Sequence, residues 1–462
     1  MQRIIHAAFY LGLAFFLSCN NQPGTSSQTA AASANDSLIN GHPSWILQGN
    51  IYEVNVRQYT PEGTFCAFET HLERLKDMGV QTLWFMPIQP IGKEGRKGVL
   101  GSYYAVSDYR SINPEFGTME EWKALVSRIH DMGMKVIIDW VPNHTAPDHP
   151  WVKKHPEYYI RDSITGMPVH QPGTDWTDTR KLDYKNLQIA DSMIAAMKFW
   201  VSETGIDGFR CDHAQGQGKE FWKKCNAALR DMKKNILMLA EAEDEWVYDA
   251  GFNMSYAWKF FHKTVDVAAG RRPAFALDSV LHEFDSTFTP GALFLHFTSN
   301  HDENSWNKAD YGTMPGASHA PFAVLTQTIK QSVPLIYSGQ EVPVLEPINF
   351  FAKDTIHFNK LERANFYKTL LTLRRENSAL AVDASFKKLR TDNDAAIYAF
   401  EREKGGNKVL VILNLSKDAR EFTWKDQPSA KEWSNIFSGS KEPVETGFGI
   451  EPWGYVVYQV RQ

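Results

Sequence analysis

Short apolar runs of strand-forming residues alternate with helical segments from His42 to about residue 380. Near-continuous apolar strands that alternate with helices are typical of a parallel sheet covered by helices on its outer side. About eight strand–helix units fit this stretch, which predicts a (β/α)₈ (TIM) barrel. Three expected helices, each followed by a glycine that can stop it, are 68–78, 119–132 and 189–204, and the expected strands are 51–56, 81–86, 135–141, 207–211, 236–240, 293–298 and 334–337, with a further candidate at 252–258.

Two segments depart from this rhythm. Residues 142–185 are irregular and rich in His, Pro, Trp and Asp, and they are too long for a normal loop, so we expect an inserted subdomain after the third strand. From 381 to 462 the pattern changes to period-two alternation, which predicts an antiparallel β domain. The barrel is therefore expected in two parts, 42–141 and 186–380.

The N-terminal segment has the pattern of a targeting signal. Residues 4–17 form an apolar run of about 14 residues, shorter than the roughly 20 that span a bilayer, and residues 1–18 fit a signal peptide. The stretch 16–19 resembles a bacterial lipobox, with Phe16 where Leu is usual, so Cys19 is the expected lipidated N-terminus; an ordinary secretory signal is the alternative. Polar residues 19–41 are expected to be a disordered tether. Together these features predict an exported lipoprotein held at the outer membrane, in the periplasm or on the cell surface by its lipid.

Charge and cysteine content exclude other classes. The formal net charge is -5, so the chain lacks the basic surface that nucleic-acid binding requires. Four cysteines are too few for a disulfide-dense scaffold. Cys211 is expected to be a buried small residue, and a Cys66–Cys225 disulfide is left open.

Polar clusters follow four of the expected strands. In a barrel, the carboxyl ends of the strands converge on one pocket, so these clusters are expected to meet there. A single carboxylate at a strand end is often a helix N-cap, but four clusters from distant strands are hard to explain in this way. The clusters are 139–144 after the third strand, 210–212 after the fourth, Glu241 with Glu243 after the fifth, and 300–302 after the seventh.

The residue types in these four clusters exclude several classes of reaction. The chain has no Ser-His-Asp order, phosphate-binding loop or HExxH zinc motif, which argues against acyl transfer, phosphoryl transfer and zinc catalysis. Paired carboxylates around a scissile bond are the machinery of glycoside hydrolysis, in which one acts as a general acid and the other as a nucleophile.

Four ordered segments carry a family resemblance: DWVPNH (139–144), GFRCD (208–212), LAE (239–241) and NHD (300–302). They resemble the four sequence regions of the α-amylase family of retaining glycoside hydrolases, and the resemblance extends over about 43–460. It implies a (β/α)₈ barrel with an inserted domain B after strand three and a C-terminal β-sandwich. The implied activity is cleavage of α-glucosidic bonds, with α-1,4 bonds foremost, in starch-type glucans or malto-oligosaccharides.

The resemblance also implies roles for individual residues. Asp212 would be the nucleophile, Glu241 the acid/base and Asp302 the carboxylate that grips the sugar hydroxyls. Arg210 lies two residues before Asp212, hence on the same face of the strand, where its charge would keep Asp212 ionised. Glu243 is the alternative acid because it shares a strand face with Glu241. The remaining implied roles are hydroxyl binding by His144 and His301, ring stacking by Tyr104 and support of the pocket by Asp139.

Some positions depart from the family pattern. Gln215 and Gly216 replace a Lys-His pair that other members use for the acceptor subsites, and residues 58–62 replace an Asp-rich calcium loop. Asn143 matches a position that binds calcium in many α-amylases, so calcium is a candidate cofactor; no organic cofactor is expected. Four tryptophans near the motifs are candidates for sugar stacking, with a core position as the alternative: Trp140, Trp176, Trp246 and Trp306.

Two other functions are alternatives for this chain. A transglycosylase or isomerase of the same family would use the same three carboxylates and pass the glycosyl unit to an acceptor sugar. A non-catalytic glucan-binding homologue is disfavoured because such proteins usually lose members of the triad, and Asp212, Glu241 and Asp302 are all present.

Overall fold

The computed structural model describes residues 37–307, 316–342 and 346–461, which belong to one compact unit. The signal segment and Cys19 lie outside the described residues. Among the helices within those ranges, none has the length and apolar character needed to cross a membrane. A short antiparallel pair, β1 (Leu38–Ile39) and β2 (His42–Pro43), precedes the barrel.

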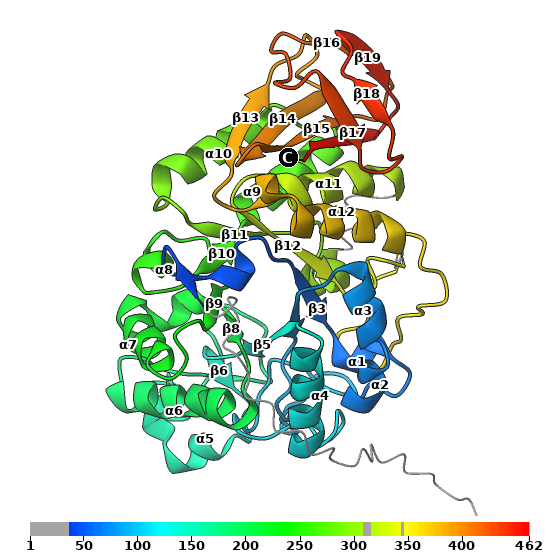
Figure 1. The fold of residues 1–462 in the computed structure, drawn as a ribbon. Helices are drawn as coiled ribbons and strands as arrows, with labels where there is room; N and C mark the ends of the chain where they lie inside the picture. Colours follow the sequence, from blue (N-terminus) through cyan, green and yellow to red (C-terminus); the bar gives the residue numbers. More distant parts are fainter. Residues whose placement is uncertain (1–36, 308–315, 343–345, 462) are drawn as a thin grey trace, which may run out of the picture. The chain divides into compact units, whose positions relative to one another are not determined.

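Eight parallel strands close into a barrel, which confirms the predicted fold class (Figure 1). The last strand pairs with the first, with Leu335 opposite Ile51, so the sheet has no free edge. In chain order the strands are β3 (Ile51–Val54), β4 (Thr82–Phe85), β5 (Lys135–Trp140), β8 (Gly208–Cys211), β9 (Leu237–Ala240), β10 (Met254–Tyr256), β11 (Leu293–His296) and β12 (Ser332–Tyr337).

Helices surround the barrel and begin and end at recognisable signals. Thr118 and Glu121 form a capping box at the start of α4, and Gly79 ends α3 in the left-handed conformation, with φ 101°. The helix expected at 68–78 is broken into two, α2 and α3. The helices are α1 (Val56–Tyr59), α2 (Phe65–Glu69), α3 (Leu72–Met78), α4 (Met119–Asp131), α6 (Leu187–Thr204), α7 (Lys219–Arg230), α8 (Trp246–Asp249), α9 (Trp258–Ala268), α10 (Ala276–Thr287), α11 (His319–Thr328) and α12 (Ala364–Glu376).

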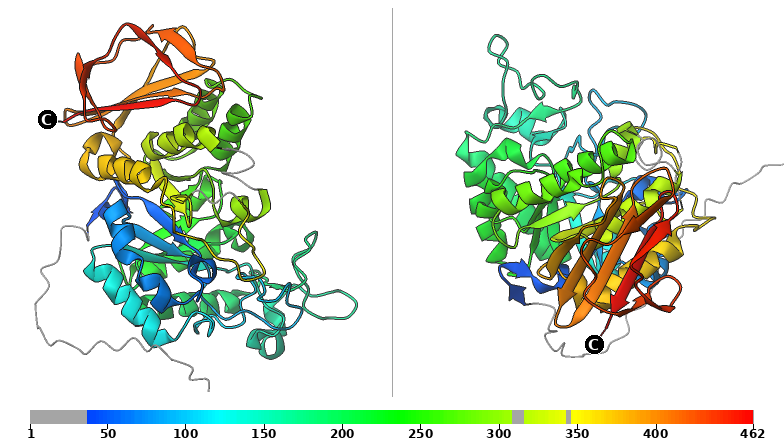
Figure 2. Two further views of the ribbon diagram at one scale, coloured as in Figure 1. Left: turned by 90° about the vertical axis from the view of Figure 1, so that its right-hand side faces the viewer. Right: turned by 90° about the horizontal axis from the view of Figure 1, so that it is seen from above.

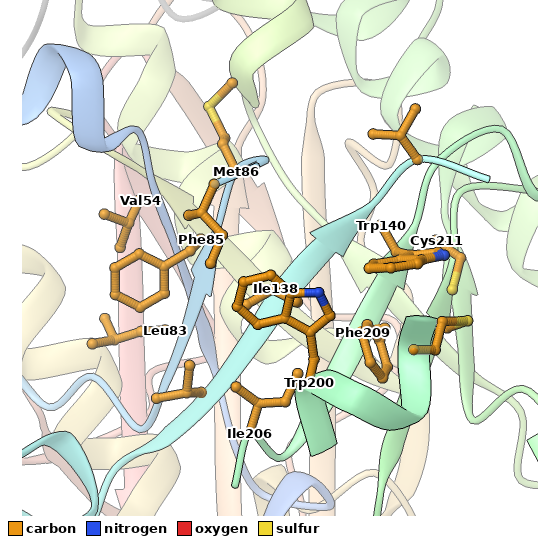
Figure 3. Close-up of a cluster of buried hydrophobic side chains, with 14 of the residues drawn as sticks. Val54, Leu83, Phe85, Met86, Ile138, Trp140, Trp200, Ile206, Phe209 and Cys211 are labelled. Atoms are coloured by element: carbon orange, nitrogen blue, oxygen red, sulfur yellow. The ribbon is translucent and has the colours of Figure 1, made fainter. Parts of the chain in front are cut away.

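Strand alternation separates the core from the site. On β8, Phe209 and Cys211 point outward and pack with Trp200 of α6, as Figure 3 shows. Arg210 lies between them in the sequence, so its side chain points to the opposite face, into the barrel. On β5, Trp140 is on the outer face and Asp139 on the inner one by the same alternation. The free thiol of Cys211 is buried, as predicted.

An inserted segment lies between β5 and α6, and extends away from the barrel in both views of Figure 2. Its first and last strands, β6 (His144–Thr145) and β7 (Arg180–Lys181), pair antiparallel, with His144 opposite Lys181. This pairing returns the chain to the barrel mouth beside the loop that carries Asn143 and His144. Between the two strands lies α5 (Pro150–Lys154).

The C-terminal region is antiparallel, as predicted. A six-stranded sheet has the order β13-β14-β15-β20-β17-β18, and β16 pairs with β19 in a second sheet. Alternate residues of β15 face different partners: Val409 and Val411 join the core shared with the barrel, whereas Leu410 and Ile412 join a core that contains Phe422 of β16. The strands are β13 (Ser385–Leu389), β14 (Ile397–Lys404), β15 (Asn407–Asn414), β16 (Arg420–Thr423), β17 (Glu432–Asn435), β18 (Lys441–Pro443), β19 (Gly447–Ile450) and β20 (Tyr455–Val460).

Candidate active site

A pocket of about 710 Å³ brings most of the predicted site residues together. It lies at the carboxyl ends of the barrel strands, where the loops that follow β5, β8, β9 and β11 converge. Arg210 and Asn143 lie next to this pocket but do not line it. The predicted residues that line it are Tyr104, His144, Asp212, Glu241, His301 and Asp302.

The buried guanidinium of Arg210 organises the carboxylates. Its Nη1 lies 3.0 Å from Asp139 Oδ1 and 3.0 Å from Asp212 Oδ1, and its Nη2 lies 2.7 Å from Glu241 Oε1. Its Nε donates to the hydroxyl of Tyr256 at 3.0 Å. One cation therefore contacts three carboxylates, and it holds Asp212 and Glu241 next to each other.

The charges in this cluster are not balanced. Burial raises the pKa of Asp212 well above its ordinary value, the charge of Glu241 raises it further, and Arg210 opposes both. Burial likewise raises the pKa of Asp139 to about 6 against the attraction of Arg210. Arg210 favours the ionised form of Asp212, as expected, but burial and the neighbouring carboxylates act against it. The cluster retains a proton more readily than isolated carboxyl groups do.

His301 lies between two carboxylates, that of Asp302 in the pocket and that of Glu53 on β3. Its Nδ1 lies 2.5 Å from Glu53 Oε1 and its Nε2 lies 3.3 Å from Asp302 Oδ2. Burial by itself lowers the pKa of His301, but the charges of Asp302 and Glu53 outweigh it and raise the pKa well above the ordinary value. A protonated His301 between two carboxylates holds Asp302 in the pocket. The partial burial of Asp302 raises the pKa of its carboxyl group, but the charge of His301 and hydrogen bonds from His301 and Trp306 outweigh it and lower that pKa.

Tyr104 connects the carboxylate cluster around Arg210 with His301. Its hydroxyl lies 3.0 Å from Asp139 Oδ2 and 2.7 Å from His301 Nε2. Its ring stacks with that of His301, with ring centroids 5.4 Å apart. The side chain of Tyr104 is thus fixed at both the ring and the hydroxyl, as a rigid sugar platform requires.

The two candidate acids, Glu241 and Glu243, have different surroundings. Glu241 lines the pocket, contacts Arg210 and accepts a hydrogen bond from the backbone nitrogen of His213 at 2.7 Å. Both oxygens of Glu243 instead accept from the backbone nitrogen of Lys259, at 3.0 and 3.1 Å. Burial raises the pKa of Glu243 to about 7, a suitable value for a general acid. The carboxylate of Glu243 is nevertheless hydrogen-bonded to the first turn of α9 and does not line the pocket, so the geometry favours Glu241 as the general acid.

The candidate tryptophans divide into two groups. Trp176 and Trp306 line the pocket, and Trp306 is 53% exposed. Trp140 is fully buried in the core outside the barrel strands (Figure 3), and Trp246 packs against the same core. Trp140 and Trp246 therefore take the core position that was the alternative for each of them.

The surroundings of Asn143 do not fit a calcium ion. The Oδ1 of Asn143 accepts a hydrogen bond from the ammonium of Lys181, and the Nδ2 lies 3.2 Å from Nδ1 of His144. A cation would compete with the ammonium for the same oxygen, next to a positive charge. Burial, with the charges of Lys181 and His213, lowers the pKa of His144 to about 3, so His144 enters the pocket as a neutral ring. Burial also lowers the pKa of Lys181 to about 8.

The sequence analysis missed several residues of the site. Glu53 does not line the pocket but contacts His301 from β3; it is fully buried and could have been noticed as a charged residue within an apolar strand. The aromatic residues Trp258, Phe350 and Phe351 line the pocket itself. They carry no local pattern that separates them from core aromatics, and only the fold brings them to the site.

Comparison with known proteins identifies the family of the chain. Residues 32–408 match the family model described as "Alpha amylase, catalytic domain". The chain is 23% identical to Alpha-amylase 3 of Dictyoglomus thermophilum, over 90% of this chain and 94% of the relative. It is 25% identical to a cyclomaltodextrinase of Thermoanaerobacter pseudethanolicus, over 78% of this chain and 65% of the relative.

Solved structures give the same result. A noncanonic maltogenic α-amylase, AmyB, from Thermotoga neapolitana superposes with a TM-score of 0.82 at 28% identity, covering 90% of this chain and 99% of that one. An α-amylase from Lactobacillus plantarum superposes with a TM-score of 0.81 at 28% identity, covering 90% and 100% of the two chains. The family model, the relatives and the barrel agree: the chain belongs to the α-amylase family and is an enzyme of that family.

Proposed function

We propose that the chain hydrolyses α-glucosidic bonds, foremost α-1,4 bonds in starch-type glucans or malto-oligosaccharides, with retention of configuration. The observation that carries this proposal is that Arg210 contacts both Asp212 and Glu241 in one pocket. Retaining glycosidases need their two carboxyl groups about 5–5.5 Å apart, and contact with a single guanidinium keeps two carboxylates at close range.

In the first step, an Asp212 oxygen attacks the anomeric carbon while the bond from that carbon to the glycosidic oxygen breaks. Glu241 gives its proton to the departing oxygen, and the products are a glycosyl ester on Asp212 and a shortened glucan. This assignment requires that the proton retained by the cluster be on Glu241 when the bond breaks.

In the second step, the Glu241 carboxylate takes a proton from water, and the water oxygen attacks the anomeric carbon. The ester bond to Asp212 breaks, so the free sugar leaves and both carboxyl groups return to their starting state. Asp302, held by His301, and the neutral ring of His144 are proposed to bind sugar hydroxyls, and Tyr104 to stack on the ring.

Transfer to an acceptor sugar is the second candidate, since water and a sugar hydroxyl compete for the same ester. The chain is 26% identical to the α-1,4-glucan:maltose-1-phosphate maltosyltransferase of Corynebacterium glutamicum, over 78% of this chain and 57% of the relative. The side chains of Glu241 and Asp302 are 18% and 39% exposed, so water has access to the carboxylates of the site, as hydrolysis requires.

We also propose that the enzyme is exported and held at a membrane through lipid on Cys19. The short apolar run, the small residue before Cys19 and the polar tether after it support this proposal. An anchored enzyme outside the cytoplasm would meet extracellular glucan before it is taken up.

Incubation of the purified chain with starch, pullulan, cyclodextrin and maltose tests the proposed activity. We expect reducing sugar from starch, and proton NMR during the first turnovers should detect the α-anomer first. A β-anomer as first product would reject the retaining mechanism. Products longer than the substrate, with little free sugar, would favour transfer over hydrolysis.

A further inference from the structure

An internal ammonium joins the two ends of the inserted segment beside the catalytic pocket. Lys181 is on β7, near the end of the segment, and its Nζ donates to Oδ1 of Asn143, at the start of the segment just after β5. Asn143 is fully buried, and its backbone oxygen accepts from the nitrogen of Leu182 at 3.1 Å. The loop after Asp212 approaches this bond at Gly216.

Gly216 shows how closely that loop approaches. A Cβ at position 216 would lie 2.4 Å from Asn143 Oδ1 and 3.1 Å from Lys181 Nζ, so a side chain there would displace both groups. The amide orientation of Asn143 is fixed by its Nδ2 contact with His144, which directs Oδ1 toward the ammonium. The ammonium thus lies where the two ends of the inserted segment meet the nucleophile loop.

This junction bears on the acid/base carboxylate. Gly216 donates from its backbone nitrogen to the oxygen of His213 at 3.1 Å, and His213 donates from its own backbone nitrogen to Glu241 at 2.7 Å. His213 has a positive φ of 44°, a conformation that a non-glycine residue keeps only when its surroundings hold it. A contact that fixes Gly216 therefore also fixes the donor to Glu241.

We propose that Lys181 supplies the positive charge that holds the two ends of the inserted segment together against the nucleophile loop, so that no calcium ion is needed at Asn143. The ammonium uses the amide oxygen that the family resemblance assigns to calcium. Lys181 is in this sense a positioning residue: it does not line the pocket, and it acts through Asn143 and the loop from His213 to Gly216.

The same chemistry recurs at the loop after β3. The Nζ of Lys353 donates to the backbone oxygens of Arg57 and Thr60. A Cβ at Gly63 would lie 2.7 Å from the Arg57 oxygen and 3.3 Å from that ammonium. Here too an ammonium binds oxygens in a close-packed loop, in the region where the resemblance would place an Asp-rich calcium loop.

The first test needs no variant. The full chain is treated with excess EDTA, dialysed, and its thermal unfolding midpoint is measured with and without millimolar calcium. We expect the same midpoint and the same turnover of a soluble malto-oligosaccharide in both. A midpoint that falls on chelation and returns with calcium would overturn the proposal, since a ligand that binds the native state must raise its stability.

The second test removes the positive charge of Lys181. Lys181→Met should lower the midpoint by several degrees and lower kcat about tenfold or more, with a smaller change in KM, because misplacement of a catalytic group acts mainly on the chemical step. Lys185→Met is the matched control: Lys185 is exposed, four residues further on, and loses the same charge. Equal midpoints and kcat values for Lys181→Met and the wild type would refute the role of Lys181.

The third variant, Lys181→Asp, separates a cation requirement from simple loss of packing. It places a carboxylate near Asn143 Oδ1 and leaves room for an ion, so calcium, which binds oxygen ligands, should restore part of its midpoint and kcat. Calcium should leave Lys181→Met and the wild type unchanged. Failure of calcium to rescue Lys181→Asp at any concentration would contradict the proposed cation role. The midpoints do not depend on the substrate, so they remain informative if the proposed activity is wrong.

Discussion

The assignment of Glu241 as the acid can be tested by the same substitution at two carboxylates that are two residues apart. Glu241 faces two different positive or donor groups, Nη2 of Arg210 at 2.7 Å and the backbone nitrogen of His213 at 2.7 Å. A glutamine can offer its oxygen to only one of them, and its NH₂ group faces the other. We expect Glu241→Gln to lower the free energy of unfolding by about 1–3 kcal/mol.

Glu243 provides the control because both of its oxygens accept from a single backbone nitrogen, that of Lys259. The oxygen of a glutamine can replace them, so Glu243→Gln should cost no more than about 1 kcal/mol. Glu243 lies outside the pocket, and turnover should stay within about threefold of the wild type.

The expected loss of activity is much larger at Glu241. Removal of a general acid lowers kcat by roughly 10²–10⁴, which is about 2.7–5.4 kcal/mol of transition-state stabilisation. An α-glycosyl fluoride needs little protonation of its leaving group, so Glu241→Gln should still form the glycosyl ester from it. Hydrolysis of that ester needs the same residue as a base, so the ester should accumulate.

Mass spectrometry of peptides from the trapped enzyme tests the assignments of the nucleophile and of the acid. The added mass should lie on Asp212 in Glu241→Gln, and Asp212→Ala should form no ester from any leaving group. If Glu243→Gln is instead the inactive variant that fluoride rescues, the acid is Glu243. A labelled Asp302 would refute the assignment of the nucleophile.

Three further predictions concern the pocket and the N-terminus. Asp302 and Glu53 raise the pKa of His301, so the stability that the proton on His301 contributes is present below pH 6.5 and is lost as the pH rises through the raised pKa. Glu53→Gln should move that loss of stability to lower pH in thermal unfolding scans. Identical pH profiles of the variant and the wild type would refute the pairing of Glu53 with His301. Trp306→Ala, at a 53% exposed side chain, should raise KM for malto-oligosaccharides about two- to tenfold with little change in the unfolding midpoint; an unchanged KM would exclude Trp306 from the substrate site. Cys19→Ala should move the protein from the membrane fraction to the soluble fraction. If the wild-type protein incorporates no radioactivity from palmitate in the growth medium, the lipid anchor is ruled out.

Much of the fold could be read from local patterns. The apolar strands, the helix-stop glycines and the change to alternation after residue 380 depend on neighbours within a few positions, so they are visible in the chain. The break between α2 and α3 was not foreseen, because the helical pattern continues through Thr70 and His71 and only the geometry there ends the first helix.

The site was partly visible for the same reason. Asp212, Glu241 and Asp302 stand at strand ends in short motifs, and the parallel barrel guarantees that such ends meet. The choice between Glu241 and Glu243 was open in the chain, since both share a strand face. The distant partners Arg210 and Lys259, whose positions no local pattern contains, favour Glu241.

Period, strand ends and motifs are local properties, so the barrel, its C-terminal β domain and the candidate carboxylates can be predicted from the chain. The charged groups around those carboxylates follow from the tertiary structure: Glu53 contacts His301, and Lys181 binds the oxygen of Asn143. Electrostatic interactions depend on distance in space, and these partners are separated by 248 and 38 positions along the chain. Closure of the barrel and pairing of β6 with β7 bring them together.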